Sequence, residues 1–316
     1  MPISSSRLRG HKIEIHGHRG ARGLFPENTL PGYAYALSTG IRTLELDVQL
    51  TADNILVATH DFTLSTAQTR DSNGHWLTGT GPETIGLTVE QLKCYDIGGL
   101  KPASDYGAKF PDQAFLDGVR IPTLEEVMQF CRHHERQSGA PGVILNIEIK
   151  SDPTRPSHPE RAEATVDALL SLISKHDYGN QSIIQSFDWA ILDLVLDKAP
   201  HLKRSYLTMA AQNGEHATIY KGSPWLGKTA CLSQDESIPS LIRKAGGDNW
   251  SSFFKDLDEK TVAEARALGV GIYVWTVNER QDIDRMIELG VDAIISDYPA
   301  RVHRRLLEHQ ENLSTL

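Results

Sequence analysis

Cysteine is scarce in this chain of 316 residues, which contains Cys94, Cys131 and Cys231 far apart from one another. An odd number of widely spaced cysteines predicts neither a disulfide framework nor a zinc knuckle. A reducing, cytoplasmic compartment is therefore the default expectation.

Long hydrophobic runs are missing as well. No stretch approaches the roughly 18 consecutive apolar residues of a membrane helix, so no transmembrane segment is predicted. Residues 1–12 carry Arg7, Arg9 and Lys12 but no apolar core, so no signal peptide is predicted. A periplasmic location stays open if the chain shown is a processed form.

Positive charge is in short supply. The chain has 32 Lys and Arg against 41 Asp and Glu, a formal net charge of -9. Nucleic-acid binding through the overall field requires a basic surface, so a nucleic-acid partner is not expected. With 40% hydrophobic and 23% charged residues the chain has ample material for a core, and a homo-oligomer is compatible with this composition.

Short β-rich runs alternate with amphipathic helical runs along the chain. Strands are predicted at 13–18, 43–50, 55–60, 142–150, 182–186, 203–208, 250–253, 271–277 and 293–297. Helices are predicted at 26–39, after Pro122, at 160–175, 189–198, 259–268 and 279–289, and from about residue 300. This alternation is typical of parallel βαβ units. The number of units and the lack of a glycine-rich nucleotide fingerprint favour an α/β TIM (β/α)8 barrel over an open sheet.

The stretch at about 61–120 breaks the alternation, because it is rich in Gly, Thr, Asp and Pro and has one helical piece near Val89–Cys94. A structureless loop of that length is uncommon in a compact domain unless it is functional. We interpret it as a small insertion subdomain after the second strand unit, packed over one end of the barrel. A second irregular piece, 210–237, forms another wall in this interpretation. Residues 1–316 are predicted to form one domain.

Carboxylates stand out on two predicted strands. Strands of a parallel barrel are buried on both faces, and barrel active sites gather at their carboxyl ends. Glu45 and Asp47 are two residues apart and project to the same face. With Glu148 from a later strand they form an all-oxygen set that suits Mg²⁺ or Ca²⁺ better than zinc. Burying three carboxylates for stability alone is costly, which favours the metal interpretation. The alternative is structural ion pairing with neighbouring cations, namely Arg19, Arg42 or Lys150.

Two histidines also fall at predicted strand ends beside the acidic pair. His18 and His60 have side chains whose ordinary pKa lies near neutrality, so they are candidates for general acid and base. The other histidines are assigned no role, since a lone histidine is more often a structural or surface residue.

The same strand ends carry positive charge and one aromatic. Arg19 and Lys150 would bind an anionic substrate, Arg as a planar fork and Lys as a point charge. Trp275 ends a late strand and either lines the pocket or fills the barrel rim. Asp297 ends the last strand, and its role is left open.

Together these groups predict phosphodiester cleavage. A divalent cation, Arg and Lys would neutralise phosphoryl oxygens, while one histidine takes a proton from the nucleophile and the other gives one to the leaving oxygen.

At these residues the sequence resembles the glycerophosphodiester phosphodiesterase family, bacterial type. The likeness runs from about His16 to Arg301. The segments that carry it are His18-Arg19-Gly20, Pro26-Glu27-Asn28-Thr29, Glu45-Leu46-Asp47, His60-Asp61, Ile121-Pro122-Thr123-Leu124, Glu148-Ile149-Lys150, Trp275-Thr276-Val277-Asn278 and Ser296-Asp297-Tyr298-Pro299.

The resemblance implies a TIM barrel with a small insertion, and hydrolysis of glycerophosphodiesters such as glycerophosphocholine to an alcohol and sn-glycerol 3-phosphate. It implies a divalent cation held by Glu45, Asp47 and Glu148, with His18 and His60 as the acid–base pair. Arg19 and Lys150 would contact phosphate. Ser65–Arg70 departs from the commoner Arg-Thr-Thr run, which leaves the alcohol specificity open.

Three other interpretations compete. His16-Gly17-His18 also matches the His-x-His of metal-dependent amidohydrolase barrels, but 203–208 and 250–253 lack the further histidines such barrels need. A barrel that binds polyol phosphates or a protein without catalysis would normally lose an acid–base or metal residue, and none is missing. Lysophospholipase D activity on the same site requires an exposed apolar rim, for which the candidates are Trp225, Leu226, Trp250, Phe253 and Phe254.

Overall fold

The computed structural model describes residues 12–139, 142–155, 158–210, 217–227 and 236–314. Within these residues nine strands form one sheet in the hydrogen-bonded order β1-β9-β8-β7-β6-β5-β4-β2-β3, and β1 also pairs with β2. Leaving β3 aside, the order of eight strands closes on itself. The chain is thus an α/β TIM barrel, as the alternation predicts.

Most predicted elements are confirmed within a few residues. The strands are β1 Glu14–Gly17, β2 Thr43–Leu50, β3 Leu56–Ala58, β4 Ile144–Ile149, β5 Ser182–Ser186, β6 Lys203–Thr208, β7 Asn249–Phe253, β8 Gly271–Trp275 and β9 Ala293–Ser296. The α-helices are α1 Leu30–Ser38, α2 Val89–Leu92, α3 Asp105–Lys109, α4 Leu124–Ser138, α5 His158–Lys175, α6 Trp189–Lys198, α7 Ile238–Lys244, α8 Glu259–Ala267, α9 Arg280–Leu289 and α10 Pro299–Ser314. Helix α7 was not predicted, because its seven residues are too few to show a helical period.

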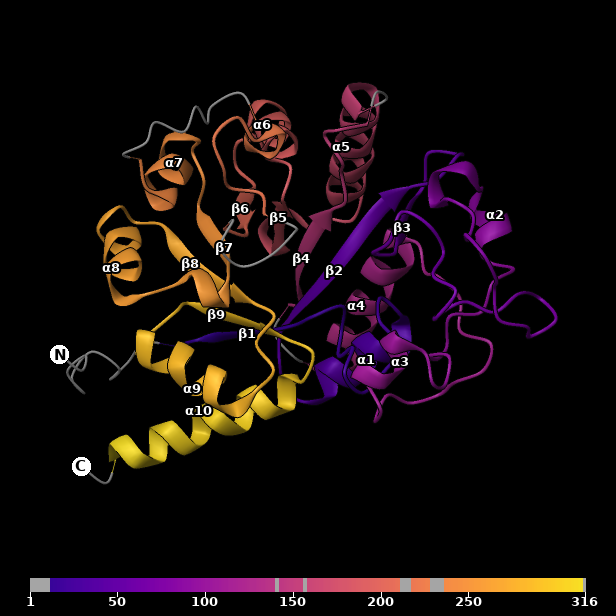
Figure 1. Cartoon of the computed structure of the whole chain (residues 1–316), viewed down its shortest axis with the longest axis horizontal. Helices are drawn as coiled ribbons and strands as arrows, with labels where there is room; N and C mark the ends of the chain where they lie inside the picture. Colours follow the sequence, from indigo (N-terminus) through magenta and orange to yellow (C-terminus); the bar gives the residue numbers. More distant parts are fainter. Residues whose placement is uncertain (1–11, 140–141, 156–157, 211–216, 228–235, 315–316) are drawn as a thin grey trace. The chain divides into compact units, whose positions relative to one another are not determined.

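Contacts divide the described chain into two compact units. One unit comprises residues 17–139, 142–150 and 160–182. Its centre is β2, a long strand on which every residue is buried and which pairs in parallel with β4 (Figure 1). The register places Asp47 opposite Glu148 and Glu45 opposite Asn146. The backbone register of β2 and β4 therefore brings the predicted carboxylates together, whichever rotamers their side chains adopt.

Strand β3 corrects one prediction. The pattern predicts a strand at 55–60 within the parallel alternation, but β3 covers Leu56–Ala58 and pairs antiparallel with β2. A turn this short joins antiparallel strands, whereas a parallel pair needs a crossover of a dozen or more residues. The hairpin leads the chain back from the carboxyl end of β2 to its middle, where the amide of Thr59 donates to the carbonyl of Asp47 at 3.1 Å. His60 reaches the site by this return.

Helix α1 begins later than the sequence pattern indicates. Thr29 is its N-cap and accepts a hydrogen bond from the amide of Gly32, so the helix starts at Leu30 rather than at Pro26. Asn28 has a φ of 53°, in the left-handed region that no right-handed helix contains. Pro26, Glu27 and Asn28 consequently form a loop, and the side chains of Glu27 and Asn28 are buried.

The irregular stretch at 61–120 has its own small core. Leu64 and Leu92 pack with Val57 and Ile121, and Leu77, Leu87, Val89, Tyr95 and Ile97 surround them. Helix α2 confirms the short helical piece predicted near residue 89, and α3 adds a second one. The stretch contacts the loop after β1, because the amide of Ala114 donates to the carbonyl of Leu24 at 2.8 Å.

The second unit comprises residues 12–16, 151–155, 158–159, 183–210, 217–227 and 236–314. Strands β5 to β9 lie in parallel pairs, and buried Trp189 of α6 packs edge-on against Tyr206 of β6. Helix α10 packs along α9 (Figure 1). Of the predicted second wall at 210–237, residues 211–216 and 228–235 lie outside the described residues, as does Cys231. Cys94, exposed, and Cys131, buried, are free thiols.

Candidate active site

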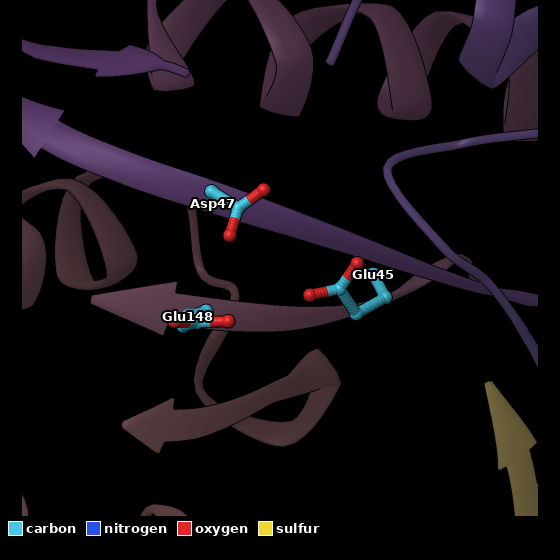
Figure 2. Close-up of side chains that lie close together, drawn as sticks. All are labelled: Glu45, Asp47 and Glu148. Carbon is cyan, nitrogen blue, oxygen red and sulfur yellow. The ribbon is translucent and has the colours of Figure 1, made fainter. Parts of the chain in front are cut away.

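Three carboxylates form the centre of the candidate site. Glu45 and Asp47 project from β2 and Glu148 from β4, and Figure 2 shows their carboxylates turned toward one another. One oxygen from each lies within 4.8 Å of the others. All three side chains are buried, with exposed fractions of 2%, 1% and 7% respectively. The i, i+2 spacing on one strand and the register with the next thus produce the geometry that the sequence predicted.

Two cations flank the carboxylates. Lys150 Nζ lies 2.7 Å from Glu148 Oε1 and 3.9 Å from Asp47 Oδ1. Arg19 Nε lies 3.2 Å from Asp47 Oδ2, and the backbone amide of Arg19 donates to Glu45 Oε2 at 2.9 Å. The predicted partner Arg42 instead donates to the carbonyl of Gly142. Ion pairing and metal binding are therefore compatible, since the carboxylates that form these ion pairs are also the group that could hold a metal ion.

The charge balance of the cluster fits a bound cation. Arg19 and Lys150 bring two positive charges to three carboxylates. Burial, followed by the neighbouring charges of Asp47 and Glu148, raises the pKa of Glu45 well above its usual range. Burial alone would also raise the pKa of Asp47, but Arg19, His60 and Lys150 outweigh it and lower that pKa. A hard cation among these oxygens would stabilise the ionised form of Glu45, which burial and the neighbouring carboxylates disfavour.

The two predicted histidines lie in the same unit as the carboxylates. His18 Nε2 is 4.0 Å from Glu45 Oε2, and the His18 side chain is 11% exposed. His60 is more open, at 31%, and its Nδ1 lies 2.6 Å from Asp61 Oδ1. The backbone around His60 is fixed by Gln49, whose side-chain amide donates to the carbonyls of Thr59, His60 and Asp61. His60 is therefore held from both its main chain and its ring.

The loop between β1 and α1 supplies two side chains for which the residue pattern alone predicts no role. Glu27 Oε1 accepts from Arg19 Nη1 at 2.7 Å, and Asn28 Nδ2 donates to Asp47 Oδ2 at 2.9 Å. The loop turns sharply, since a Cβ on Gly17 would lie 2.2 Å from the carbonyl oxygen of Gly20. Both residues lie in a polar run, Pro26-Glu27-Asn28-Thr29, which could have indicated a functional loop but which by its local pattern predicts the start of a helix.

A small hollow connects this loop to the insertion. It has a volume of about 20 Å³. Its walls include Glu27, Asn28, His60 and Asp61 together with insertion residues such as Thr69 and Ile97. The insertion therefore packs directly against the groups that surround the carboxylates of its own unit.

Trp275 belongs to the other unit. Its indole N–H donates to the carbonyl of Ser251 at 3.0 Å, and its ring contacts Phe187 and Phe253, with centroids 5.3 and 5.5 Å away. Trp275 is partly buried in this aromatic group at the end of β8. Asp297, whose role was left open, is fully buried, and its Oδ2 accepts from Asn278 Nδ2 at 2.6 Å.

The two rival hydrolase interpretations gain no support. In the part of the chain that the structure describes, the group of side chains close enough to share a metal contains carboxylates and no histidine. His16 is buried, edge-on against Tyr273. Of the five residues proposed for an apolar rim, Leu226, Trp250 and Phe254 are buried, with exposed fractions of 2%, 1% and 7%. No helix in the described ranges combines the length and apolar character needed to cross a membrane.

The model of the Glycerophosphoryl diester phosphodiesterase family matches residues 18–301, a span that contains each predicted site residue. Among curated proteins, a glycerophosphodiester phosphodiesterase of Caldanaerobacter subterraneus subsp. tengcongensis is 30% identical over 91% of this chain and 95% of its own length. A glycerophosphodiester phosphodiesterase of Bacillus subtilis is 29% identical over 96% of this chain and 91% of its own.

Solved structures give the same picture. A crystal structure from Silicibacter pomeroyi, named as a candidate glycerophosphoryl diester phosphodiesterase, has a TM-score of 0.84 and 38% identity and covers 95% of both chains. An Oleispira antarctica phosphodiesterase in complex with the product sn-glycerol-3-phosphate has a TM-score of 0.68 and covers 96% of this chain and 99% of its own. At 22% identity the second likeness shows the fold alone.

Proposed function

The chain belongs to the glycerophosphoryl diester phosphodiesterase family, and from that premise we propose that it hydrolyses glycerophosphodiesters, such as glycerophosphocholine, to an alcohol and sn-glycerol 3-phosphate. The observation that carries the proposal is the buried group of Glu45, Asp47 and Glu148 with Arg19 and Lys150 in contact. Buried carboxylates in such number are costly to a fold, which points to a functional reason for keeping them.

In this proposal the resident cofactor is Mg²⁺ or Ca²⁺, held by Glu45, Asp47 and Glu148. The all-oxygen donor set and its excess negative charge support a hard divalent cation. When bound, the cation supplies positive charge to the phosphoryl oxygens and helps to orient the substrate.

Arg19 and Lys150 are the proposed phosphate ligands. The guanidinium of Arg19 and the ammonium of Lys150 each have several N–H donors, and the ion pairs with Glu27, Asp47 and Glu148 engage some of them. The carboxylates thereby fix the direction in which the remaining donors point. Trp275 is also a proposed substrate-binding residue, and its half-buried ring lies among aromatic side chains.

His18 and His60 are the proposed proton-transfer groups. Because Asp61 engages Nδ1 of His60, Nε2 is the ring atom available for exchange with substrate. His18 sits beside Glu45, one of the proposed cation ligands. One histidine takes the proton of the nucleophile and the other donates to the leaving oxygen, a pairing that typically contributes 10²–10⁴-fold to the rate, in order of magnitude.

The test is release of glycerol 3-phosphate from glycerophosphocholine with Mg²⁺, with Ca²⁺ and with excess chelator. We expect product with at least one cation and none with chelator. Product that is insensitive to chelator would contradict the cation assignment. No product from glycerophosphocholine or from larger glycerophosphodiesters would contradict the proposed function, and lysophospholipids would then be the next substrates to assay.

A further inference from the structure

The insertion reaches the substrate-binding groups through one phenol. Tyr106 lies on α3, whose first turn is capped by the side chain of Ser104. The Tyr106 hydroxyl donates a short hydrogen bond to Glu27 Oε2, and Arg22 Nη1 lies 3.4 Å from the same hydroxyl. The ring packs edge-on against Phe110, with centroids 5.5 Å apart. Helix α3 and the adjoining Phe110 thus fix the position of the Tyr106 ring, independently of its contact with Glu27.

Glu27 bridges Tyr106 and Arg19. The Glu27 side chain is 6% exposed, and its two oxygens have different partners: Oε2 accepts from Tyr106 and Oε1 from Arg19 Nη1 at 2.7 Å. The Nε of Arg19 lies 3.2 Å from Asp47 Oδ2, so the guanidinium is fixed between two carboxylates. Tyr106 is therefore linked to Asp47, a carboxylate of the proposed metal site, through two intervening residues, Glu27 and Arg19.

Removing the phenol hydroxyl would disturb this arrangement. A buried carboxylate oxygen that loses its donor is costly, and it regains a partner by rotating. Nearby donors are the guanidinium of Arg19, which already contacts the other oxygen of Glu27, and that of Arg22, which lies beside the Tyr106 hydroxyl. In either case the geometry of the Arg19 fork changes, and a fork that binds phosphate depends on its direction as well as its charge.

We propose that Tyr106 is a positioning residue by which the insertion fixes, through Glu27, the direction of the Arg19 guanidinium toward substrate phosphate. The proposal rests on the proposed function, since it assigns phosphate binding to Arg19. Tyr106 acts through Glu27 and Arg19, since its own contacts are with Glu27, Arg22 and Phe110. In this proposal the insertion contributes to the geometry of the site.

The experiment compares Tyr106→Phe, Glu27→Gln and the double variant in hydrolysis of glycerophosphocholine. The matched control is Tyr95→Phe, which removes a phenol hydroxyl from the core of the same insertion. We expect Tyr106→Phe to lower kcat/KM about tenfold, in the range found when outer-shell partners are removed. Its melting temperature and its apparent affinity for Mg²⁺ should stay within error of the parent protein. Tyr95→Phe should keep its rate.

The double variant tests whether Tyr106 affects kcat/KM through Glu27 or independently of it. If Tyr106 acts through Glu27, adding Tyr106→Phe to Glu27→Gln changes kcat/KM less than about twofold, because coupled residues are non-additive. A full tenfold loss on top of Glu27→Gln would overturn the proposal. So would wild-type kcat/KM in Tyr106→Phe, or an equal loss in Tyr95→Phe, which would indicate general weakening of the insertion.

Failure of the proposed function is distinguishable from failure of this inference. If the parent protein releases no glycerol 3-phosphate, the same variants are compared in binding inorganic phosphate by calorimetry. Weaker phosphate binding in Tyr106→Phe, abolished as a difference in the Glu27→Gln background, would still support the positioning role. Equal phosphate binding by the parent protein and Tyr106→Phe, or no binding by either, would overturn it.

Discussion

The side-chain amide of Asn28 pairs with both the main chain and the side chain of Asp47. Asn28 Nδ2 donates to Asp47 Oδ2 at 2.9 Å, and Asn28 Oδ1 accepts from the Asp47 amide at 3.2 Å. The hydroxyl of Tyr33 donates to the same Oδ1 at 3.2 Å, which fixes the amide orientation. One loop residue thus holds a proposed metal ligand in place at two points.

The first prediction concerns this pair. Asn28→Ala should lower the affinity for Mg²⁺ or Ca²⁺ and kcat/KM by roughly 10–100-fold, because Asp47 loses its orienting partner. The matched control is Asn54→Ala, since Asn54 also has a positive φ, 59°, but is exposed in the turn before β3. Both variants carry the same backbone strain, of about 1–2 kcal/mol. Equal losses of activity in the two would show that strain, not the contact with Asp47, is responsible.

The second prediction concerns Glu45. Glu45→Gln should abolish cation-dependent hydrolysis, because the substitution removes one of three carboxylate ligands. Without cation the variant should be at least as stable as the parent protein, since it replaces a carboxyl whose ionised form is disfavoured by burial and by the charges of Asp47 and Glu148. Thermal unfolding is measured with and without cation. In the parent protein, cation at 100 times its Kd should add about 2.7 kcal/mol.

Asp112→Asn, a change of an exposed loop carboxylate, is the control for Glu45→Gln. It should keep both hydrolysis and the cation-dependent rise in melting temperature. A Glu45→Gln variant that turns over at a near-normal rate would remove Glu45 from the metal site.

The third prediction separates proton transfer from cation binding. His18→Ala should lose about 10²–10⁴-fold in kcat and still bind cation. Asp61→Asn should lose part of the same factor, because the ring of His60 would no longer be oriented by a carboxylate at 2.6 Å. Calorimetric titration with cation, alongside steady-state rates, measures both. His75→Ala is the control, as His75 is exposed in the insertion, and an equal drop in kcat there would discredit the assignment.

The fourth prediction concerns acid stability of the insertion. The carboxylate of Asp96 accepts from the amides of Gly98 and Gly118 at 2.9 and 2.8 Å and from Arg70 Nη2 at 3.0 Å. Burial alone would raise the pKa of Asp96, but the two amides and Arg70 outweigh it and lower the pKa. Its stabilisation is therefore complete above the unfolded pKa of about 3.9 and is lost as pH falls through the lower folded pKa.

Asp96→Asn should accordingly lower the free energy of unfolding at pH 7 by about 1–3 kcal/mol, and the gap to the parent protein should narrow below about pH 4. Denaturant unfolding at a series of pH values measures this. The control is Asp117→Asn, because Asp117 contacts the same arginine but its side chain is 85% exposed. A gap that stays constant down to pH 2 would contradict the role given to Asp96.

The sequence by itself determined the fold class and the centre of the site. Strands alternating with helices predicted the closed barrel, and the i, i+2 spacing of Glu45 and Asp47 required that they share a face. Such predictions succeed because strand period and the burial of parallel strands are local properties. Charged residues on strands that ought to be apolar are visible without knowledge of any partner.

Tertiary structure decided what depends on contacts distant in sequence. The hairpin that makes β3 antiparallel brings His60 back to Asp47, whereas sequence periodicity could not tell this strand from a barrel strand. The local sequence predicts that Glu27 and Asn28 begin a helix. The structure places them in a loop, and the φ of 53° at Asn28 depends on the tertiary contacts of that loop. Tyr106 meets Glu27 across 79 positions of the chain, and no local pattern encodes a contact of that separation.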